Sequence, residues 1–210
     1  MNLTENFLSI KRQIEILSNK TKLIVVSKNQ SAESILSLIN TGHEHFGENR
    51  VQESISKWSK IVSNYNNIKL HFIGKLQSNK TKEVYNLFHY MHSLDNEKLA
   101  SNFSKLESNN KKKLKYFIQV NIGSELQKSG IEESQVTKFY HYCKNELKIN
   151  VIGLMCIPPV DLPSDNFFIK LKELADVNNL KDLSMGMSGD FQAAIKYGST
   201  FVRIGSAIFK

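Results

Sequence analysis

The sequence predicts a single α/β domain in which eight parallel strands close into a (β/α)8 TIM barrel, with helices outside and an extra helix before the first strand. Strand-sized apolar runs alternate along the chain with segments of helical period. Several runs are too apolar to leave one face in water, which indicates a sheet covered on both faces. No Pro- or Gly-rich linker divides residues 1–210, so one domain is expected. An open doubly wound sheet is the alternative.

The strands are expected at short apolar segments that are rich in β-branched and aromatic residues. In chain order they are LIVVS (23–27), HEHFG (43–47), LHFIG (70–74), YMHSL (90–94), KYFIQVNI (115–122), NVIGLMCI (150–157), LSMGM (183–187) and FVRIG (201–205). Functional groups of such a barrel lie where the strands end at their C-terminal sides. The polar groups found there belong to Ser27, Lys28, Glu48, Asn49, Lys75, Asn121, Ser188, Arg203 and Ser206.

The helices are expected where apolar residues recur at steps of three and four. Before the first strand the stripe is Leu3, Phe7, Ile10, Ile14 and Leu17. The later stripes are Val51, Ile55, Trp58 and Val62; Leu99, Phe103 and Leu106; Val136, Phe139, Tyr140, Cys143 and Leu147; and Phe167, Leu171, Leu174 and Val177. Only SAIFK follows the last strand. We therefore expect the first helix to cover the wall that a final helix would shield.

Composition indicates a cytoplasmic protein without a membrane span. Hydrophobic residues make up 40% of the chain and charged residues 23%, and the longest apolar runs have strand length. The first residues have no basic segment followed by an apolar block, so a signal peptide is not expected. The two cysteines, Cys143 and Cys156, form no CxxC pair, which favours a reducing compartment.

The net charge of +8 raises the question of a nucleic-acid partner. The excess is almost entirely lysine, and its densest cluster, SNNKKKLK, lies in a polar linker before a strand. No aromatic RNA-binding signature accompanies that cluster, so a solvated loop is the favoured interpretation. No metal site is expected either, because His43, His45, His89 and His92 lack a carboxylate or thiol at ligand spacing.

Lys28 is the candidate for covalent chemistry. It directly follows the apolar strand LIVVS, where an ammonium group can lose hydration and so favour the neutral amine that forms a Schiff base. Its position alone also fits an ordinary surface lysine.

Two turns after the last two predicted strands are candidates for phosphate binding. In SMGMSGDFQ, Ser188 is a natural helix N-cap and Gly189 allows close approach of a ligand to the backbone. Gly205 and Ser206 follow the next strand in the same way. Arg203 lies two residues before Gly205, so its side chain should point into the barrel, where a guanidinium needs an acceptor. Ordinary capping explains either turn alone, whereas the pair corresponds to the usual phosphate site of these barrels.

Long motifs of the chain resemble those of one family. They read VVSKNQ, FGENRVQE, HFIGKLQSNK, VNIGSELQKSGI, GLMCIP and LSMGMSGDFQAAIKYGSTFVRIGSAIF. By these motifs the chain resembles the pyridoxal 5′-phosphate (PLP) homeostasis proteins, single-domain relatives of alanine racemase. The resemblance implies a barrel like the alanine racemase N-terminal domain, the fold type III of PLP proteins.

The resemblance also implies the cofactor and the residues that hold it. Lys28 would carry PLP as an internal aldimine, a Schiff base. The phosphate would be bound by Ser188, Gly205 and Ser206, together with the backbone of Met187, Ser188 and Gly189. Arg203 would face the pyridine nitrogen and Asn49 would lie near the ring and its 3-oxygen. His71, Gln77, Ser78 and Asn79 lie in another family motif and are expected near the mouth, while Glu48, Arg50 and Lys75 receive no role.

The arginine bears on whether the chain is an enzyme. A cationic partner disfavours protonation of the ring nitrogen and so weakens the ring as an electron sink. Racemase relatives add a β-rich domain and a partner subunit that supply a tyrosine acid/base, and no residues remain here for that domain. We therefore expect a PLP carrier that acts in PLP homeostasis without robust turnover, with a monomer favoured over an oligomer. Candidate protein partners are PLP-dependent apo-enzymes.

Two alternatives to the carrier stay open. One is a weak PLP-dependent racemase-type enzyme. The other is a barrel enzyme of aldolase type that uses Lys28 without PLP.

Overall fold

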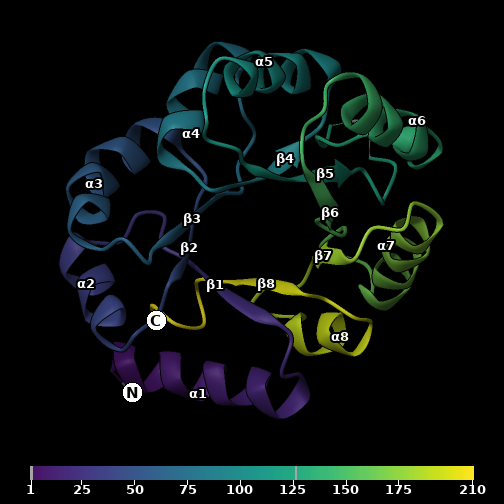
Figure 1. The fold of residues 1–210 in the computed structure, drawn as a ribbon. Coiled ribbons are helices and arrows are strands. Elements are labelled where there is room, and N and C mark those ends of the chain that lie inside the picture. The colour runs from purple at the N-terminus through teal and green to yellow at the C-terminus, as the bar shows by residue number, and fades with distance from the viewer. Residues whose placement is uncertain (1, 126) are drawn as a thin grey trace.

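The apolar segments form eight parallel strands of one closed barrel in the computed structural model, which describes residues 2–125 and 127–210 (Figure 1). Met1, at the start of the predicted domain, and Leu126, in the motif VNIGSELQKSGI, lie outside the described residues. The strands are β1 (Lys22–Val26), β2 (His45–Glu48), β3 (Lys69–Phe72), β4 (Tyr90–Leu94), β5 (Lys115–Val120), β6 (Val151–Cys156), β7 (Asp182–Ser184) and β8 (Phe201–Ile204). Each strand pairs with the next along the chain, and β8 pairs with β1, so the barrel is confirmed and the open sheet is wrong.

The seventh strand is shorter than predicted. It ends at Ser184, whereas the pattern placed Met185, Gly186 and Met187 in it as well. Gly186 adopts a φ of +94°, a left-handed conformation that interrupts a strand and that glycine accepts without steric cost. The chain therefore leaves the sheet early and forms the turn that lines the mouth of the barrel.

Helices surround the sheet on its outside (Figure 1). They are α1 (Leu3–Leu17), α2 (Ala32–Asn40), α3 (Val51–Asn64), α4 (Thr81–Leu87), α5 (Glu97–Ser108), α6 (Val136–His141), α7 (Asp165–Val177) and α8 (Phe191–Lys196). Helix α6 continues into a π-helical segment, Tyr142–Glu146, which keeps Cys143 buried. None of the helices in the described part of the chain combines the length and the hydropathy that a membrane crossing requires.

Helix α1 covers the wall next to the seam between β1 and β8, as expected. It lies between α2 and α8 in the ring of helices (Figure 1). Phe7, Ile10 and Ile14 are buried, and a capping box between Asn2 and Glu5 fixes the start of the helix.

The predicted stripe of α7 is confirmed in part, since Leu171 is buried and Phe167 and Leu174 pack partly buried against the core. Phe168, Leu171 and Ala175 are buried, whereas Val177, predicted to be a core residue, is 72% exposed. Two adjacent phenylalanines made two neighbouring stripes compatible with the pattern. Packing on β6 and β7 selects the one that contains Phe168.

The inside of the barrel has an apolar part and a polar part. Ile24, Tyr90, Phe117, Met155 and Phe201 form an inner hydrophobic cluster that is separate from the larger core between sheet and helices. The polar side chains His71, His92, Ser184 and Arg203 are buried in the same interior. Side chains therefore fill the middle of the barrel, and a cavity of about 750 Å³ lies at the C-terminal ends of the strands.

Candidate functional site

A cavity of about 750 Å³ opens at the C-terminal ends of the strands. All eight residues predicted for the cofactor line it: Lys28, Asn49, Met187, Ser188, Gly189, Arg203, Gly205 and Ser206. They come from the ends of β1, β2 and β8 and from the turn after β7. The structure thus brings residues from both ends of the sequence to one place, as the barrel geometry requires.

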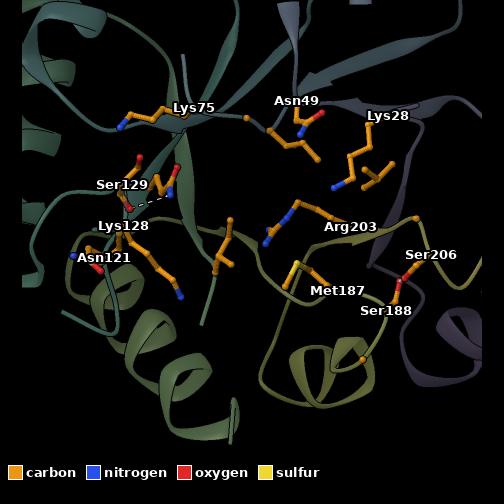
Figure 2. A pocket seen from close by; sticks show the side chains of 18 of the residues that line it. Lys28, Asn49, Lys75, Asn121, Lys128, Ser129, Met187, Ser188, Arg203 and Ser206 are labelled. Atoms are coloured by element: carbon orange, nitrogen blue, oxygen red, sulfur yellow. Dashed lines mark hydrogen bonds between the residues drawn. The ribbon is translucent and has the colours of Figure 1, made fainter. Parts of the chain in front are cut away.

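Lys28 stands at the end of β1 and points into the cavity toward Arg203 (Figure 2). It follows Ser27, which is fully buried, and precedes Asn29, whose φ of +58° turns the chain away. The Lys28 side chain itself is exposed, so the expected loss of hydration at this position is not observed. The fold instead orients the Lys28 side chain, so that its amine lies at the mouth of the barrel.

A buried network holds the segment on which Lys28 stands. The Glu48 carboxylate is fully buried, and its Oε1 accepts hydrogen bonds from Ser27 Oγ at 2.7 Å and from Trp58 Nε1 at 2.9 Å. Lys57 Nζ lies 3.0 Å from the same oxygen and donates to the Ser27 carbonyl oxygen at 2.7 Å. Glu48 had no role in the sequence-based prediction. The structure makes it the residue that anchors the end of β1 to α3.

Asn49 follows Glu48 and reaches the cavity from β2. Its Oδ1 is buried and has no hydrogen-bond partner among the described residues. The Asn49 carbonyl oxygen packs against Gly74, where an added Cβ would lie 2.1 Å from it. A side chain at position 74 would therefore displace Asn49 from the cavity wall.

The turn after β7 meets the end of β8 at two serines. Ser206 Oγ donates to Ser188 Oγ at 3.0 Å, and the Ala207 backbone N–H donates to the same oxygen at 3.3 Å. The two hydroxyls lie together on one side of the cavity (Figure 2). Gly205 lies so close to β1 that an added Cβ would be 3.0 Å from the Val26 carbonyl oxygen.

The prediction that Ser188 caps the following helix is wrong. Helix α8 begins at Phe191, and Asp190 occupies the N-cap position without a side-chain cap of its own. The Asp190 carboxylate instead accepts a hydrogen bond from the Met187 backbone N–H at 2.6 Å. The Ser188 hydroxyl is hydrogen-bonded to Ser206 and Ala207, which follow β8, and is thus kept at the cavity rather than at the helix.

Arg203 points into the barrel, as predicted, and is only 4% exposed. Its Nη1 donates to Ser184 Oγ at 2.7 Å and its Nη2 donates to the Cys156 carbonyl oxygen at 2.9 Å. Among the described residues no carboxylate forms a salt bridge with it. Burial lowers the pKa of the guanidinium, which nevertheless stays charged because its ordinary pKa is so high.

The motif that contains His71 reaches the mouth through Ile73, Gly74 and Lys75, but not through the four residues that were expected near it. His71 is fully buried inside the barrel, and Gln77, Ser78 and Asn79 do not line the cavity. The side of the cavity opposite the serines instead carries Lys75, Asn121, Lys128 and Ser129 (Figure 2). In the parts of the chain that the structure describes, no cluster of three or more His, Cys, Asp and Glu side chains could hold a metal ion.

Comparison with known proteins places this geometry in a family. Residues 1–210 match the model of the alanine racemase N-terminal domain. The PLP homeostasis protein of Haemophilus influenzae is 38% identical over 229 residues, which cover 100% of this chain and 95% of that protein. The PLP homeostasis protein of Vibrio cholerae is 39% identical over 225 residues, which cover 99% and 95%. The chain belongs to the PLP homeostasis proteins.

Solved structures of this family share the whole fold. PipY of Synechococcus elongatus without PLP is 30% identical, with a TM-score of 0.91 and full coverage of both chains. The same protein with PLP bound superposes with a TM-score of 0.88. Alanine racemase of Corynebacterium glutamicum is 14% identical with a TM-score of 0.74, over 98% of this chain and 59% of that one, which is a likeness of fold alone. The predicted family and the predicted alanine racemase-like barrel of the PLP homeostasis proteins are both confirmed.

Proposed function

We propose that this chain binds PLP as a Schiff base on Lys28 and acts as a PLP carrier in PLP homeostasis. One observation supports this most strongly. An amine, a buried guanidinium and a pair of hydroxyls face one cavity, from the ends of β1 and β8 and from the turn after β7. These are the three kinds of group that an aldehyde, a ring nitrogen and a phosphate require.

The residues that line the cavity match the cofactor in further ways. Its volume of about 750 Å³ lies within the range of ordinary ligand pockets. Asn49 Oδ1 is buried without a hydrogen-bond partner in the described part of the chain, so a ligand hydroxyl that donates to it would remove an energetic cost. Arg203 has no carboxylate partner within residues 2–125 and 127–210 and presents its charge to the cavity, where an unprotonated ring nitrogen is a suitable acceptor.

Each residue has one task in this proposal. Arg203 donates a hydrogen bond to the ring nitrogen and, being permanently charged, opposes protonation there. Ser188, Ser206 and the backbone N–H groups of the 187–189 turn bind the phosphate. Gly205 leaves room beside it, and Asn49 orients the ring through its 3-oxygen. PLP itself supplies an aldehyde that condenses with a primary amine and releases water.

The lining side chains favour storage over turnover. Among the described residues at the cavity there is no carboxylate, imidazole or phenol, the usual partners for proton transfer at a substrate carbon. The remaining basic groups are Lys28, Lys75 and Lys128. We further propose that residues 1–210 act as one domain, as a cytoplasmic monomer, and that PLP-dependent apo-enzymes receive PLP from it.

Reduction of the Schiff base with borohydride tests the attachment of PLP to Lys28. Purified protein is mixed with PLP, its absorbance near ~420 nm is recorded, and borohydride is added before peptide mapping. We expect one pyridoxyl adduct, on Lys28. Lys28→Ala should abolish both the band and the adduct, whereas the control Lys75→Ala, which removes another amine of the same cavity, should keep both. An adduct that maps elsewhere, or a full band in Lys28→Ala, would refute the attachment site.

A second measurement separates the carrier from an enzyme. The protein is incubated with PLP and L-alanine in deuterium oxide, and both D-alanine and α-deuterium are measured. Rates equal to those of free PLP agree with a carrier. Exchange that is faster than with free PLP and is lost in Lys28→Ala would identify a racemase-type enzyme instead.

A further inference from the structure

A continuous line of hydrogen bonds runs through the inside of the barrel to Arg203. His45 Nδ1 lies 2.9 Å from His71 Nε2. His71 Nδ1 lies 2.9 Å from His92 Nε2. His92 Nδ1 lies 2.8 Å from Ser184 Oγ, which also accepts from Arg203 Nη1 at 2.7 Å. We call His45, His71, His92 and Ser184 the histidine relay.

The relay joins two ends of the barrel. His45 is only partly buried and lines a separate cavity of about 240 Å³, formed by α1 and by the N-terminal ends of β1 and β2 with the residues just before them. His71, His92 and Ser184 are fully buried, and Arg203 lines the large cavity at the opposite ends of the strands. The relay therefore starts at the N-terminal ends of the strands and finishes at the group that faces the ligand.

All three histidines are neutral at physiological pH. Burial lowers the pKa of His71 and of His92 well below its usual 6.5. Burial, reinforced by the charges of Lys22, Lys69 and Lys115, lowers the pKa of His45 to about 4, while Glu44 acts in the other direction. The neighbouring histidines and Arg203 add to the effect within the relay.

Only one direction of the relay satisfies Ser184. Its Oγ has two hydrogen-bond partners in the described part of the chain, and Arg203 is always a donor. If His92 also donated, Oγ would accept twice and its own proton would have no partner among the described residues. The hydroxyl proton therefore goes to His92 Nδ1, and His92 carries its proton on Nε2. The same step repeats at each ring: His92 donates to His71, and His71 donates to His45.

This direction also suits the charge of Arg203. Each hydroxyl or imidazole turns its acceptor atom toward the guanidinium and its proton away from it. The dipoles therefore add, and they place partial negative charge next to a buried cation that no carboxylate of the described residues pairs with. Aromatic stacking holds the rings in place: His71 lies on Tyr90 at 4.2 Å and His92 lies on Phe117 at 4.3 Å between ring centroids.

We propose that the histidine relay is a positioning device for Arg203. As one polarised line of hydrogen bonds, it fixes the guanidinium at the place of the ring nitrogen and stabilises its charge there. The histidines touch no ligand and act through Ser184. The inference rests on the proposed PLP site for its effect on the cofactor, whereas the relay itself is a property of the protein without ligand.

The first experiment uses the ligand-free protein, so it does not depend on PLP binding. Long-range proton–nitrogen NMR spectra of the imidazoles are expected to show Nε2 protonated and Nδ1 unprotonated in all three relay histidines. The Nη1 and Nη2 signals of Arg203 should be resolved, because both groups are held. Protonated Nδ1 in His71 or His92 would overturn the proposed direction.

Four variants test the coupling. His45→Phe removes the last acceptor at the far end, and His92→Phe removes the acceptor of Ser184. His92→Asn returns an acceptor near the position of Nδ1. His43→Phe is the matched control, since His43 is also buried with a pKa lowered to about 4 and packs on Phe7 and Phe46. Its Nε2 lies 2.8 Å from the His45 carbonyl oxygen, so it contacts the backbone of a relay residue but no ring of the relay.

Each variant has a defined expectation. His92→Phe should merge the Arg203 Nη signals and raise the Kd for PLP about tenfold, the effect of one lost hydrogen bond to a charged site. His92→Asn should restore most of the affinity. His45→Phe should give His71 a measurable fraction of protonated Nδ1, and His43→Phe should match the parent within about twofold.

The outcomes distinguish this inference from the proposed function. If the parent forms no Schiff base on Lys28, the PLP proposal fails, while the Arg203 signals still decide whether the relay positions the guanidinium. If Arg203 gives the same signals in His92→Phe and the parent, the relay is not a positioning device. If His45→Phe leaves the tautomers of His71 and His92 unchanged, the rings are not coupled as one line.

Discussion

Acidification below about pH 6.5 is expected to destabilise this barrel through the histidines in its interior. His71 and His92 are fully buried, and burial holds the pKa of each well below its usual value. In the unfolded chain both side chains bind a proton near their ordinary pKa. The unfolded state therefore binds more protons than the folded state as the pH falls, and the free energy of unfolding must decrease.

The size of the effect follows from the burial of the His71 and His92 side chains. Each histidine that stays neutral in the folded state lowers the free energy of unfolding by ~1.4 kcal/mol for each pH unit below ~6.5. At pH 5.5 the two buried rings together remove about 3 kcal/mol from the stability at pH 7.5, out of the ~5–15 kcal/mol that is typical of a domain. The lowered pKa values of His43, His45 and His89, each about 4, act in the same direction.

Trp58, the single tryptophan, reports the unfolding because it is fully buried on α3. Urea titrations at pH 7.5 and pH 5.5 and equal ionic strength give the two free energies. His92→Phe should reduce the pH-dependent loss by about 1.4 kcal/mol, since the contribution of one buried ring is gone. A free energy of unfolding that is equal at both pH values, or higher at pH 5.5, would contradict the assignment of neutral buried histidines.

Other substitutions test the residues that support or line the cavity. Glu48→Gln should lower the free energy of unfolding by about 3 kcal/mol, since it removes one partner of a buried ion pair; urea unfolding followed by circular dichroism measures this. Gly74→Ala should cost more than ~1 kcal/mol and weaken PLP binding, because its Cβ would lie 2.1 Å from a backbone oxygen. Gly189→Ala has no atom within 4 Å of its Cβ and should change the Tm little. Ser188→Ala and Ser206→Ala should each raise the Kd for PLP about tenfold by fluorescence titration, whereas equal affinity would place the phosphate elsewhere.

The strands could be predicted because each is an apolar run of the right length, and a barrel places the end of every strand at one mouth. That rule was enough to bring Lys28, Asn49 and Arg203 to the same cavity. The cap of α8 could not be predicted, because Ser188 and Asp190 are both good N-cap residues. The contact of Ser188 Oγ with the Ala207 N–H decides between them, and this contact joins two different βα units.

The histidine relay could not be predicted from the sequence pattern for a related reason. His45 and His92 could be placed on strands, but the neighbours of each ring come from other strands. Whether His71 faces the mouth or the interior depends on the register of β3 against β2, which pairs His71 with Gly47. The role of Glu48 depends in the same way on how α3 packs, because its partners Lys57 and Trp58 lie on that helix.

The seam between β1 and β8 has a consequence for the order of folding. It pairs Lys22 with Phe201, residues separated by almost the whole described chain, and contacts of such high sequence separation form late. Lys28 lies on one side of the seam, and Arg203 and Ser206 lie on the other. A folding intermediate with an open seam therefore has no complete pocket and cannot be templated by the cofactor. PLP should act after the slowest step, by mass action on the closed barrel, so that it slows unfolding and leaves the folding rate unchanged.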